Sequence, residues 1–537
     1  MEFLSYCSSL KGLLFTSGLI GAIVIFSSVI YNLFFHPLSH IPGPLFAKAS
    51  GIPSWYHALR GRRHLWLWQQ FQIHGSRVRV TPNTVLFCDP EAYRDIYGMK
   101  SNVRRGDFYT AWRRNERDQT TLNTVDVADH ARKRKLLNLS FTDKSVRSAS
   151  AFIIQHVGRW NELLVQDCGM DWSEPTDLSN SVDTLIFDIM GDLCFGKSFD
   201  IKEPGNNPLK AVPHNITEYM QFYYPICRSP FLGFVLWLKP RGLNKLFELL
   251  TPPAVQQYYQ FVHNSVTKRI ALQQAQADKP ESQRRQDMFY FMCESRDPDT
   301  GAPAYDEQDL RGEANLLIIA GSDTTAISLS GIFFYLTGDI HRYQKLVDEI
   351  RSTFTSVDEI VHGPKLLSCG YLKACIDEGM RLTPSGPSEL PREVLPGGLE
   401  IKGEYYPPGT IVGTAAWPNS RNEEIYGDPN VFRPERWIVD NVAGVTQEDV
   451  ARARSNFHPF SMGPGNCIGK NLAMTELLIT VAQTLYRLDV RRAPGSTFGG
   501  GSPELGWGAR DAKQFQLKDA YISLRKGPMV QFRKRVN

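Results

Sequence analysis

The stretch that decides the fold is a glycine-rich run around one cysteine, Phe460-Ser461-Met462-Gly463-Pro464-Gly465-Asn466-Cys467-Ile468-Gly469. Glycines on either side of the proline let the backbone turn with φ > 0 and approach a flat partner closely. The residues after Gly469 have the pattern of a helix, and the free N–H groups at its start favour a thiolate over a thiol. The run therefore predicts a metal-ligand loop around Cys467; the alternative is an inert buried cysteine in a turn.

A second run, Ala320-Gly321-Ser322-Asp323-Thr324-Thr325, lies inside the longest periodic stretch, residues 310–336, which predicts a helix. Glycine in a helix costs about 1 kcal/mol relative to alanine, so its presence needs a reason. We expect Gly321 to let the helix open, so that the Thr324 hydroxyl turns toward a ligand or water and Asp323 offers a carboxylate for proton delivery. The alternative is a helix-packing glycine followed by threonines bonded back to their own helix.

Composition excludes several classes of protein. The chain has 537 residues, of which 42% are apolar, so it can bury a large core. A formal net charge of +4 is small for this length and gives no sign of a nucleic-acid partner. Nine cysteines, an odd number without a Cys-x-x-Cys pair, indicate neither a disulfide framework nor a zinc site.

Residues 12–35 contain no charged side chain and are long enough for the ~20 residues that a membrane-spanning helix needs. A cleaved signal peptide would have an apolar region of about 7 to 15 residues and a small-residue cleavage site, and neither is present. We therefore expect an uncleaved anchor over residues 1–36. The prolines of residues 37–48 predict a stiff hinge, and residues 49–537 form the body.

The basic residues that flank the predicted span indicate the topology. Lys11 precedes the span, whereas Arg60, Arg62 and Arg63 follow it, which favours a cytosolic body. The sequons at Asn138 and Asn215 would be glycosylated only under the opposite topology.

The pattern Phe-x-x-Gly-x-x-x-Cys-x-Gly, formed by Phe460, Gly463, Cys467 and Gly469, resembles the haem-binding loop of the cytochrome P450 family. In that family the cysteine thiolate is the axial ligand of the haem iron. The run at Thr324 resembles the family's oxygen-activation motif, and the motifs occur in family order. The resemblance implies a mainly α fold with small β-sheets around one buried haem b, and the proline-rich hinge resembles that of microsomal, filamentous-fungal members.

The resemblance also implies roles for individual residues. It places Asp323 and Thr324 in catalysis and a buried network of Glu378, Arg381 and Arg436 beneath the haem. The implied holders of the haem propionates are Arg134, Arg392 and His130, the last in place of a tryptophan that members often carry. The implied lining of the substrate pocket comprises Phe108, Tyr109, Trp112, Ala320, Ser385 and Leu390. Residues 230–238 resemble the lid that dips into the membrane, although a plain buried strand or helix fits them equally.

One position departs from the family pattern. Members usually carry arginine or histidine two residues before the ligand cysteine, where it holds a propionate, and this chain has Gly465. We therefore expect the other donors, Arg392 and Arg134, to matter more than usual. We also expect the substitution Gly465→Arg to restore haem binding partly when either of them is lost.

The implied function is a monooxygenase that inserts one atom of O2 into a lipophilic small molecule, in fungal secondary metabolism. Electrons would come from NADPH through cytochrome P450 reductase, with cytochrome b5 a further possible donor, at the endoplasmic reticulum membrane. The expected reductase surface carries Lys470, Arg452 and Arg454. Two alternatives remain: a haem-thiolate isomerase or dehydratase that needs no reductase, and a haem-binding membrane protein without enzymatic activity.

Overall fold

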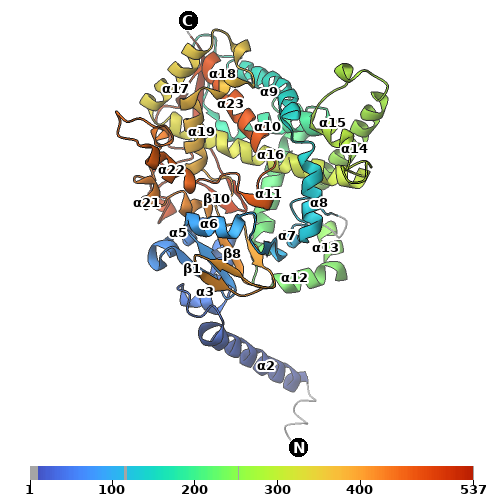
Figure 1. Cartoon of the computed structure of the whole chain (residues 1–537), viewed down its shortest axis with the longest axis vertical. Helices are drawn as coiled ribbons and strands as arrows, with labels where there is room; N and C mark the ends of the chain where they lie inside the picture. Colours follow the sequence, from blue (N-terminus) through green and yellow to red (C-terminus); the bar gives the residue numbers. More distant parts are fainter. Residues whose placement is uncertain (1–9, 114–117, 252, 536–537) are drawn as a thin grey trace, which may run out of the picture.

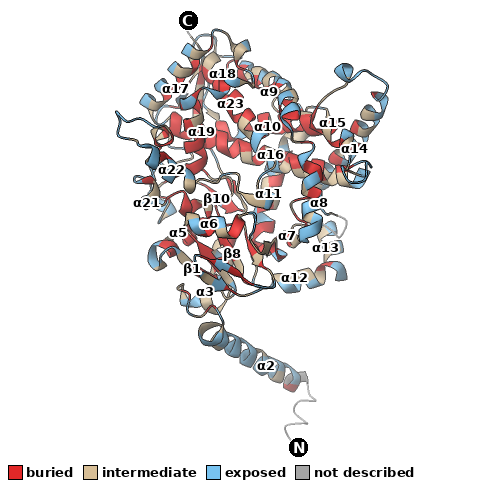
Figure 2. Cartoon of the chain, viewed as in Figure 1, coloured by how far each residue is buried: buried red, intermediate tan, exposed pale blue. Residues whose placement is uncertain are grey.

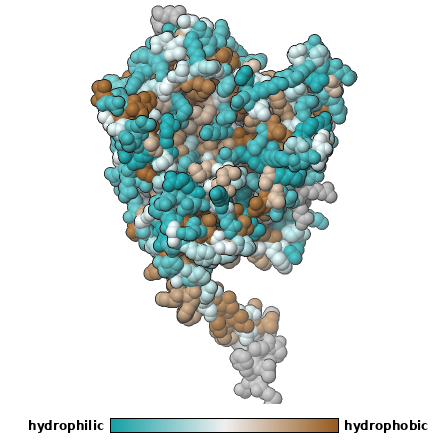
Figure 3. All heavy atoms as spheres, viewed as in Figure 1, coloured by the Kyte–Doolittle hydropathy of each residue, from teal (hydrophilic) through white to brown (hydrophobic). Residues whose placement is uncertain are grey.

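The computed structural model describes residues 10–113, 118–251 and 253–535. Its N-terminal helix α2 (Leu10–Ile30) continues into the π-helical turn η1 (Tyr31–Phe35) and extends away from the rest of the chain (Figure 1). Its apolar side chains are exposed, and Figure 3 shows them as a brown rod below a mostly teal body. Residues 12–35 are thus a candidate membrane span, while the first nine residues of the predicted anchor and the side chain of Lys11 lie outside the described part.

The body is mainly helical. Its helices, in chain order, are α3 (Leu45–Ala49), α4 (Ile52–Leu59), α5 (Arg63–His74), α6 (Pro90–Tyr97), α7 (Asp107–Ala111), α8 (Val127–Asn138), α9 (Asp143–Leu164), α10 (Leu178–Phe195), α11 (Val212–Cys227), α12 (Leu232–Leu238), α13 (Leu243–Leu250), α14 (Pro253–Ala275), α15 (Met288–Glu294), α16 (Glu307–Leu336), α17 (Ile340–Thr353), α18 (Pro364–Leu367), α19 (Gly370–Leu382), α20 (Ala416–Asn419), α21 (Glu423–Tyr426), α22 (Gln447–Ser455) and α23 (Lys470–Arg487).

Four small sheets complete the body. The largest has the strand order β1-β2-β8-β5-β3, with β2 and β8 parallel and the other pairs antiparallel. The remaining sheets are β4-β12-β9, β6-β7 and β10-β11. The strands are β1 (Arg77–Thr81), β2 (Thr84–Phe87), β3 (Val103–Arg104), β4 (Thr176–Asp177), β5 (Arg392–Val394), β6 (Leu399–Ile401), β7 (Glu404–Tyr406), β8 (Ile411–Thr414), β9 (Leu488–Arg492), β10 (Lys518–Ala520), β11 (Ile522–Leu524) and β12 (Met529–Lys534).

Helix α16 runs through the middle of the body, and Figure 2 shows α16, α10 and α23 among the most deeply buried elements. Its C-terminal half is buried on nearly every side, which is why it is apolar enough to resemble a membrane span although it is a core helix. It begins three residues before the predicted start, because the Asp306 side chain accepts a hydrogen bond from the Asp309 N–H and caps the helix. Gly331 allows close packing of the helix, because a Cβ there would lie 2.2 Å from the Thr383 hydroxyl oxygen.

The proline-rich hinge is docked on the body rather than free. Leu38 and Ile41 are buried in a core with residues of β2 and β8. Gly43 lies so close to β1 that a Cβ there would be 2.3 Å from the Arg79 carbonyl oxygen. The Arg79 guanidinium donates to the carbonyl of Asn32, at the end of the anchor. These contacts fix where the anchor leaves the body, and the predicted boundaries at residues 36 and 48 remain predictions.

Several local patterns in the sequence agree with the structure. The alternation of residues 77–88, broken by Pro82-Asn83, predicts a two-strand hairpin. This segment forms the β1-β2 hairpin, paired from Arg77 with Phe87 to Thr81 with Thr84. Helix α10 ends at Gly196, which adopts the left-handed conformation with φ of 69°. Within the segment 230–238, residues Leu232–Leu238 form helix α12, and the segment is not a strand. The predicted fold class, mainly α with small sheets and an N-terminal apolar helix, is confirmed.

Candidate active site

The cysteine loop is a tight turn held against α6. It contains the 3-10 turn η7 (Gly463–Gly465), and the Cys467 N–H donates to the Phe460 carbonyl at 2.8 Å. Gly463 has φ of 64°, and a Cβ there would lie 2.0 Å from the Tyr97 carbonyl oxygen. No other residue fits this position without moving the backbone of α6. The loop then leads directly into α23, the helix predicted from the sequence.

The Cys467 thiol is exposed, and it lines an internal cavity. Protein atoms around it keep bulk water at a distance, so burial raises the pKa of the thiol, against the opposing effects of the Gly469 N–H, Arg134 and Lys470. The expected helix-start donor is therefore present but is outweighed by desolvation. A metal cation bound at the sulfur would reverse this balance, because a coordinating thiol is deprotonated.

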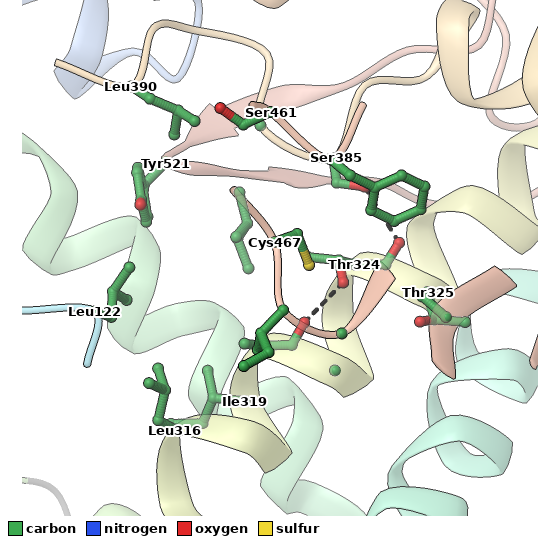
Figure 4. Close-up of a pocket in the computed structure, with 18 of the residues that line it drawn as sticks. Leu122, Leu316, Ile319, Thr324, Thr325, Ser385, Leu390, Ser461, Cys467 and Tyr521 are labelled. Atoms are coloured by element: carbon green, nitrogen blue, oxygen red, sulfur yellow. Dashed lines mark hydrogen bonds between the residues drawn. The ribbon is translucent and has the colours of Figure 1, made fainter. Parts of the chain in front are cut away.

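The cavity has a volume of about 550 Å³ and separates the cysteine loop from α16. Figure 4 shows Cys467 on one side, with Leu316, Ile319 and Thr324 of α16 and Leu122 and Tyr521 from other elements around the same space. Burial alternates along α16 so that its less buried residues face this space. The cavity is thus walled by the two motifs that the sequence singles out.

Thr324 is not in the expected conformation. Its hydroxyl donates to the Ala320 carbonyl at 2.7 Å, and α16 is an unbroken α-helix through this region. Gly321 serves packing, because a Cβ there would lie 2.6 Å from Cε of Met190. The expectation of an opened helix with a free hydroxyl is therefore wrong, and the alternative of a packing glycine with a back-bonded threonine holds. The Thr324 oxygen can still accept a hydrogen bond from a molecule in the cavity.

Asp323 lies beside the cavity rather than on its lining. It is buried, and its Oδ2 atom has no hydrogen-bond partner among the described residues. Burial, together with the nearby Asp183 carboxylate, raises its pKa to about 7, against an opposing effect of Arg525. A carboxyl with this pKa can both hold and release a proton near neutral pH.

The three residues expected beneath the haem are in contact. The Arg381 guanidinium donates to both carboxylate oxygens of Glu378 at 2.8 and 2.9 Å, and Arg436 donates to the same carboxylate at 3.0 Å. Trp437 and the Arg433 N–H complete its set of donors. Burial alone would raise the pKa of Glu378, but these partners lower it below its usual value. The result is an ionised, fully bonded carboxylate in the interior.

A group of cations without carboxylate partners gathers at one edge of the cavity. Arg134 donates to the carbonyl and side-chain oxygens of Asn466, next to the cysteine. Arg105, which the sequence analysis missed, lines the cavity and donates to the Thr121 carbonyl. Burial and the neighbouring Arg392 lower the pKa of Arg105 to about 10. Among the described residues none of these three arginines forms an ion pair, so this edge of the cavity suits an anionic ligand.

His130 lies near this group but carries no charge at neutral pH. Burial and repulsion from the three arginines lower its pKa to about 4, and its buried Nε2 atom has no partner among the described residues. It can therefore exchange a hydrogen bond with an anion but cannot neutralise one.

The space left by Gly465 is already filled. A Cβ at this position would lie 2.8 Å from Nη2 of Arg392, so Arg392 occupies the volume that a larger side chain would need. Arg392 itself donates to the Tyr109 hydroxyl at 3.0 Å and to the Pro391 carbonyl. The expectation that Gly465→Arg partly restores haem binding stays a prediction; in an Arg134 variant the new side chain would have to displace the flexible end of Arg392.

The predicted pocket residues divide into two sets. Those on the cavity lining are Trp112, Ala320, Ser385 and Leu390. Phe108 and Tyr109 are not on it. Phe108 is buried against Tyr224 and Tyr521, and Tyr109 supports Arg392. Of the predicted cofactor residues, Phe460, Cys467, Gly469 and Arg134 are on the lining, whereas Gly463, Arg392 and His130 lie behind it.

Glu476 is a second residue that the sequence analysis missed. It is buried on α23, lines the cavity and accepts a hydrogen bond from Thr325 at 3.1 Å. Its other oxygen has no partner among the described residues, and burial raises its pKa to about 8. Glu476 is the one acidic residue in the largely apolar sequence of α23, and this feature could have identified it from the sequence.

A charged network fixes the segment that carries Ser385 and Leu390. Glu389 is buried between Arg63, at 2.5 and 2.9 Å, and Arg228, at 2.5 Å. The neighbouring Ser388 donates to the Asp519 carboxylate, which also accepts from the Tyr224 hydroxyl. Since Tyr224 belongs to α11 and Arg228 follows it directly, the network ties the end of α11 to the cavity wall.

Comparison with known proteins agrees with this architecture. The family model described as Cytochrome P450 matches residues 43–499. Relatives include the cytochrome P450 monooxygenase poxM of Penicillium oxalicum, 33% identical over 96% of this chain and 93% of that protein. The monooxygenase fscF of Fusarium equiseti is 32% identical over 94% of each chain, and apf7 of Gibberella fujikuroi is 32% identical over 94% of this chain and 95% of its own.

The match covers most of the chain and includes both walls of the cavity. The family implies a bound haem, and the exposed thiol and the unpaired cations fit one. The predicted family is thereby confirmed: the chain belongs to the cytochrome P450 family.

Proposed function

We propose that this protein is a haem-thiolate monooxygenase that inserts one oxygen atom from O2 into a lipophilic small molecule of fungal secondary metabolism. The observation that carries the proposal is the cavity that Cys467 shares with Thr324 of α16, with Asp323 buried beside it. An isomerase or dehydratase has less use for a proton-holding carboxyl beside the cavity. The relatives' names, cytochrome P450 monooxygenase, favour the same activity.

The haem would be held by Cys467 through its sulfur and by Arg105, Arg134 and Arg392 through its propionates. The three guanidinium groups provide the positive charge that two carboxylates need. Among the described residues no carboxylate pairs with these three arginines. Bound haem supplies the electron-transfer and O2 chemistry that side chains lack. The Glu378 network would hold the chain beneath it.

Proton supply is the proposed role of Asp323 and Thr324. Burial raises the pKa of Asp323 to about 7, so its carboxyl can hold a proton near neutral pH. Thr324 lines the cavity, and its oxygen can accept a hydrogen bond from a water molecule there. At the same time its hydroxyl group donates a hydrogen bond to the Ala320 carbonyl. Asp323 would thus donate, and Thr324 would orient the water that passes the proton on.

Electrons are proposed to come from NADPH through cytochrome P450 reductase, with cytochrome b5 as a second donor. Lys470, at the start of α23 and three residues after Cys467, is exposed, as are Arg452 and Arg454. Arg452 pairs with Asp449, so it offers less free charge than the sequence suggests. Lys470 is the best candidate for contact with an acidic reductase surface.

The proposed location is the endoplasmic reticulum membrane, with the body in the cytosol and a second membrane contact at α12. Phe231, Phe234 and Trp237 of this segment are exposed. A Cβ at Gly51 would lie 3.2 Å from Cβ of Pro230, so α4 and the start of this segment are in contact. Both lie at the end of the body that carries α2 (Figure 1), as expected for one membrane-facing surface.

The sequons also bear on topology. Asn138 is exposed at the end of α8, whereas Asn215 lines the cavity. Asn138 is therefore the more accessible of the two sequons in the folded protein.

The first prediction tests the thiolate. Cys467→Ser removes the anionic donor, so the reduced carbon-monoxide complex should lose its thiolate-type Soret band. Absorption spectra of the purified wild type and variant measure this. Cys369→Ser, at a buried cysteine outside the cavity lining, is the control and should leave the band in place. A thiolate band that survives in Cys467→Ser would refute the proposed ligand.

The second prediction concerns Arg105. Loss of one charge-assisted hydrogen bond should speed the loss of haem to an apomyoglobin acceptor by roughly tenfold to a hundredfold in Arg105→Ala, as in Arg134→Ala. The matched control is Arg104→Ala, because Arg104 pairs with Glu393 and does not line the cavity. Equal haem-loss rates in Arg105→Ala and Arg104→Ala would show that Arg105 does not hold the cofactor.

The third prediction concerns proton supply. In the wild type, reductase-driven NADPH oxidation should fall as pH rises through about 7, because Asp323 loses its proton there. Asp323→Asn should be slower by at least about tenfold and should lack this pH dependence. Ser322→Ala removes an adjacent buried hydroxyl without a partner among the described residues and serves as control. A pH profile that is the same in all three proteins would exclude Asp323 as the donor.

The fourth prediction concerns the membrane. A chain that begins at Tyr31 lacks α2 but keeps the contact between Asn32 and Arg79. It should still float with vesicles of neutral phospholipid, and Phe231→Glu with Trp237→Glu should release it. The control pair, Val361→Glu with Val442→Glu, changes exposed apolar residues elsewhere and should stay bound. If both pairs float equally, α12 is not a membrane contact.

A further inference from the structure

The part of the cavity formed by α11, α14 and the first half of α16 differs from the part near Cys467. Each of these helices turns at least one polar side chain toward the cavity: Asn215 and Tyr219 from α11, Tyr258 from α14 and Asn315 from α16. Asn215 and Tyr219 are four residues apart and so lie on one face of α11. Such convergence in a largely apolar cavity is what fixes the orientation of a ligand.

The polar groups of α11 are free to bond to a ligand, whereas those of the nearby loop at Thr121 and Asn123 are already hydrogen-bonded within the protein. Thr121 donates to Glu313, and Asn123 bonds to the backbone of Thr120 and Asp118, so the loop that faces this end is engaged internally. The Asn215 amide and the Tyr219 hydroxyl have no hydrogen-bond partner among the described residues, yet neither is closed off in the interior. They remain in reach of a molecule in the cavity.

Asn315 is oriented by a neighbour. Its Oδ1 atom accepts a hydrogen bond from the Tyr258 hydroxyl at 2.9 Å. Tyr258 is buried, so turning the amide over would leave the hydroxyl proton without an acceptor. The Asn315 side chain therefore keeps its N–H donors free of partners among the described residues, and a ligand at this place must present an acceptor.

The polar groups are separated from the reaction site by an apolar wall. Asn315 precedes Thr324 by nine residues, which is about 13 Å along a helix. Between them Leu316, Ile319 and Ala320 line the cavity (Figure 4), and Ile216 lines it from α11. A ligand that spans both ends thus needs an apolar body.

Charge limits the polar group of the ligand. The described arginines on the lining are Arg105 and Arg134, which border the cysteine loop, and Arg381 of the buried network. At the polar end the described lining residues include no lysine or arginine, so an ionised carboxylate would lack a counter-charge there. A hydroxyl or carbonyl oxygen is the group that these donors suit.

We infer that the substrate is an uncharged, elongated lipophilic molecule whose hydroxyl or carbonyl oxygen is bound by Asn315, Asn215 and Tyr219, about 13 Å along α16 from the reacting end. This rests on the proposed function only for the place where oxidation occurs. The polar group would orient the molecule so that its apolar end lies beside Thr324.

The test compares binding of two radiolabelled probes of equal length, undecan-1-ol and dodecane, to the haem-loaded full-length enzyme in one detergent, by equilibrium dialysis. The measured quantity is the alcohol-to-alkane affinity ratio, relative to wild type, because detergent partitioning then cancels. Loss of one hydrogen bond should lower the ratio about fivefold in Asn315→Leu and in Asn215→Leu. The control Gln221→Leu removes an exposed amide of α11 outside the cavity lining and should leave the ratio unchanged.

A fall in at least one amide variant but not in the control supports the polar-end site, and an unchanged ratio in both overturns it. Asn215→Leu decides the matter if Asn315→Leu fails to fold, because Asn215 bonds to no described residue whereas Asn315 supports Tyr258. The carbon-monoxide spectrum of each sample reports the thiolate separately. A missing thiolate band would contradict the proposed function whatever the binding ratio, and a normal band with an unchanged ratio would contradict only the substrate class.

Discussion

The close approach of Gly463 to the carbonyl of Tyr97 is the constraint on which the site depends. It allows the cysteine loop to lie directly against α6, and a Cβ at 2.0 Å from that oxygen would push the loop away. The loop in turn sets the start of α23 and the position of the thiol opposite α16. The Glu378 network supports the segment that leads into the loop, because Trp437, which donates to Glu378, packs against Phe457.

Charge in the interior is arranged in two opposite ways. Glu378 and Glu389 each have two arginine partners, and such groups are structural because removing one partner leaves a buried unpaired charge. At the edge of the cavity, Arg105, Arg134 and Arg392 have no carboxylate partner among the described residues, so their charges repel one another. A bound anionic cofactor would relieve that repulsion, and the proposed haem site would account for the cluster.

Helices and the hairpin could be predicted because their signals are local. Apolar residues alternate along residues 77–88 and recur at helical spacing along α16, because in each element they occupy the side that faces the core. The orientation of the Thr324 hydroxyl could not be predicted, because the sequence allows both a bond to Ala320 and a contact with the cavity. Arg105 was missed for a related reason: its role comes from packing beside Arg392, which lies 287 residues later in the numbering and has no fixed spacing from it. Phe108 was assigned to the pocket because aromatic residues in a loop do not reveal which way they turn.

Helix α11 would link the proposed substrate recognition to the opening of the cavity. Asn215 and Tyr219 in its first half face the cavity, while Tyr224 in its last turn and Arg228 just beyond bond to Asp519 and Glu389. Breaking a buried pair such as Arg228 with Glu389 is strongly unfavourable, so the C-terminal end of α11 is a fixed point. Any opening that admits a substrate must then use the first half of α11 or the first half of the neighbouring α14, which lack such pairs among the described residues. In the second half of α14, Arg269 forms a buried pair with Asp287. Asn215 and Tyr219, which would bind the polar group, lie on the first half of α11, so a bound substrate would hold closed the part of the helix that moves to admit it.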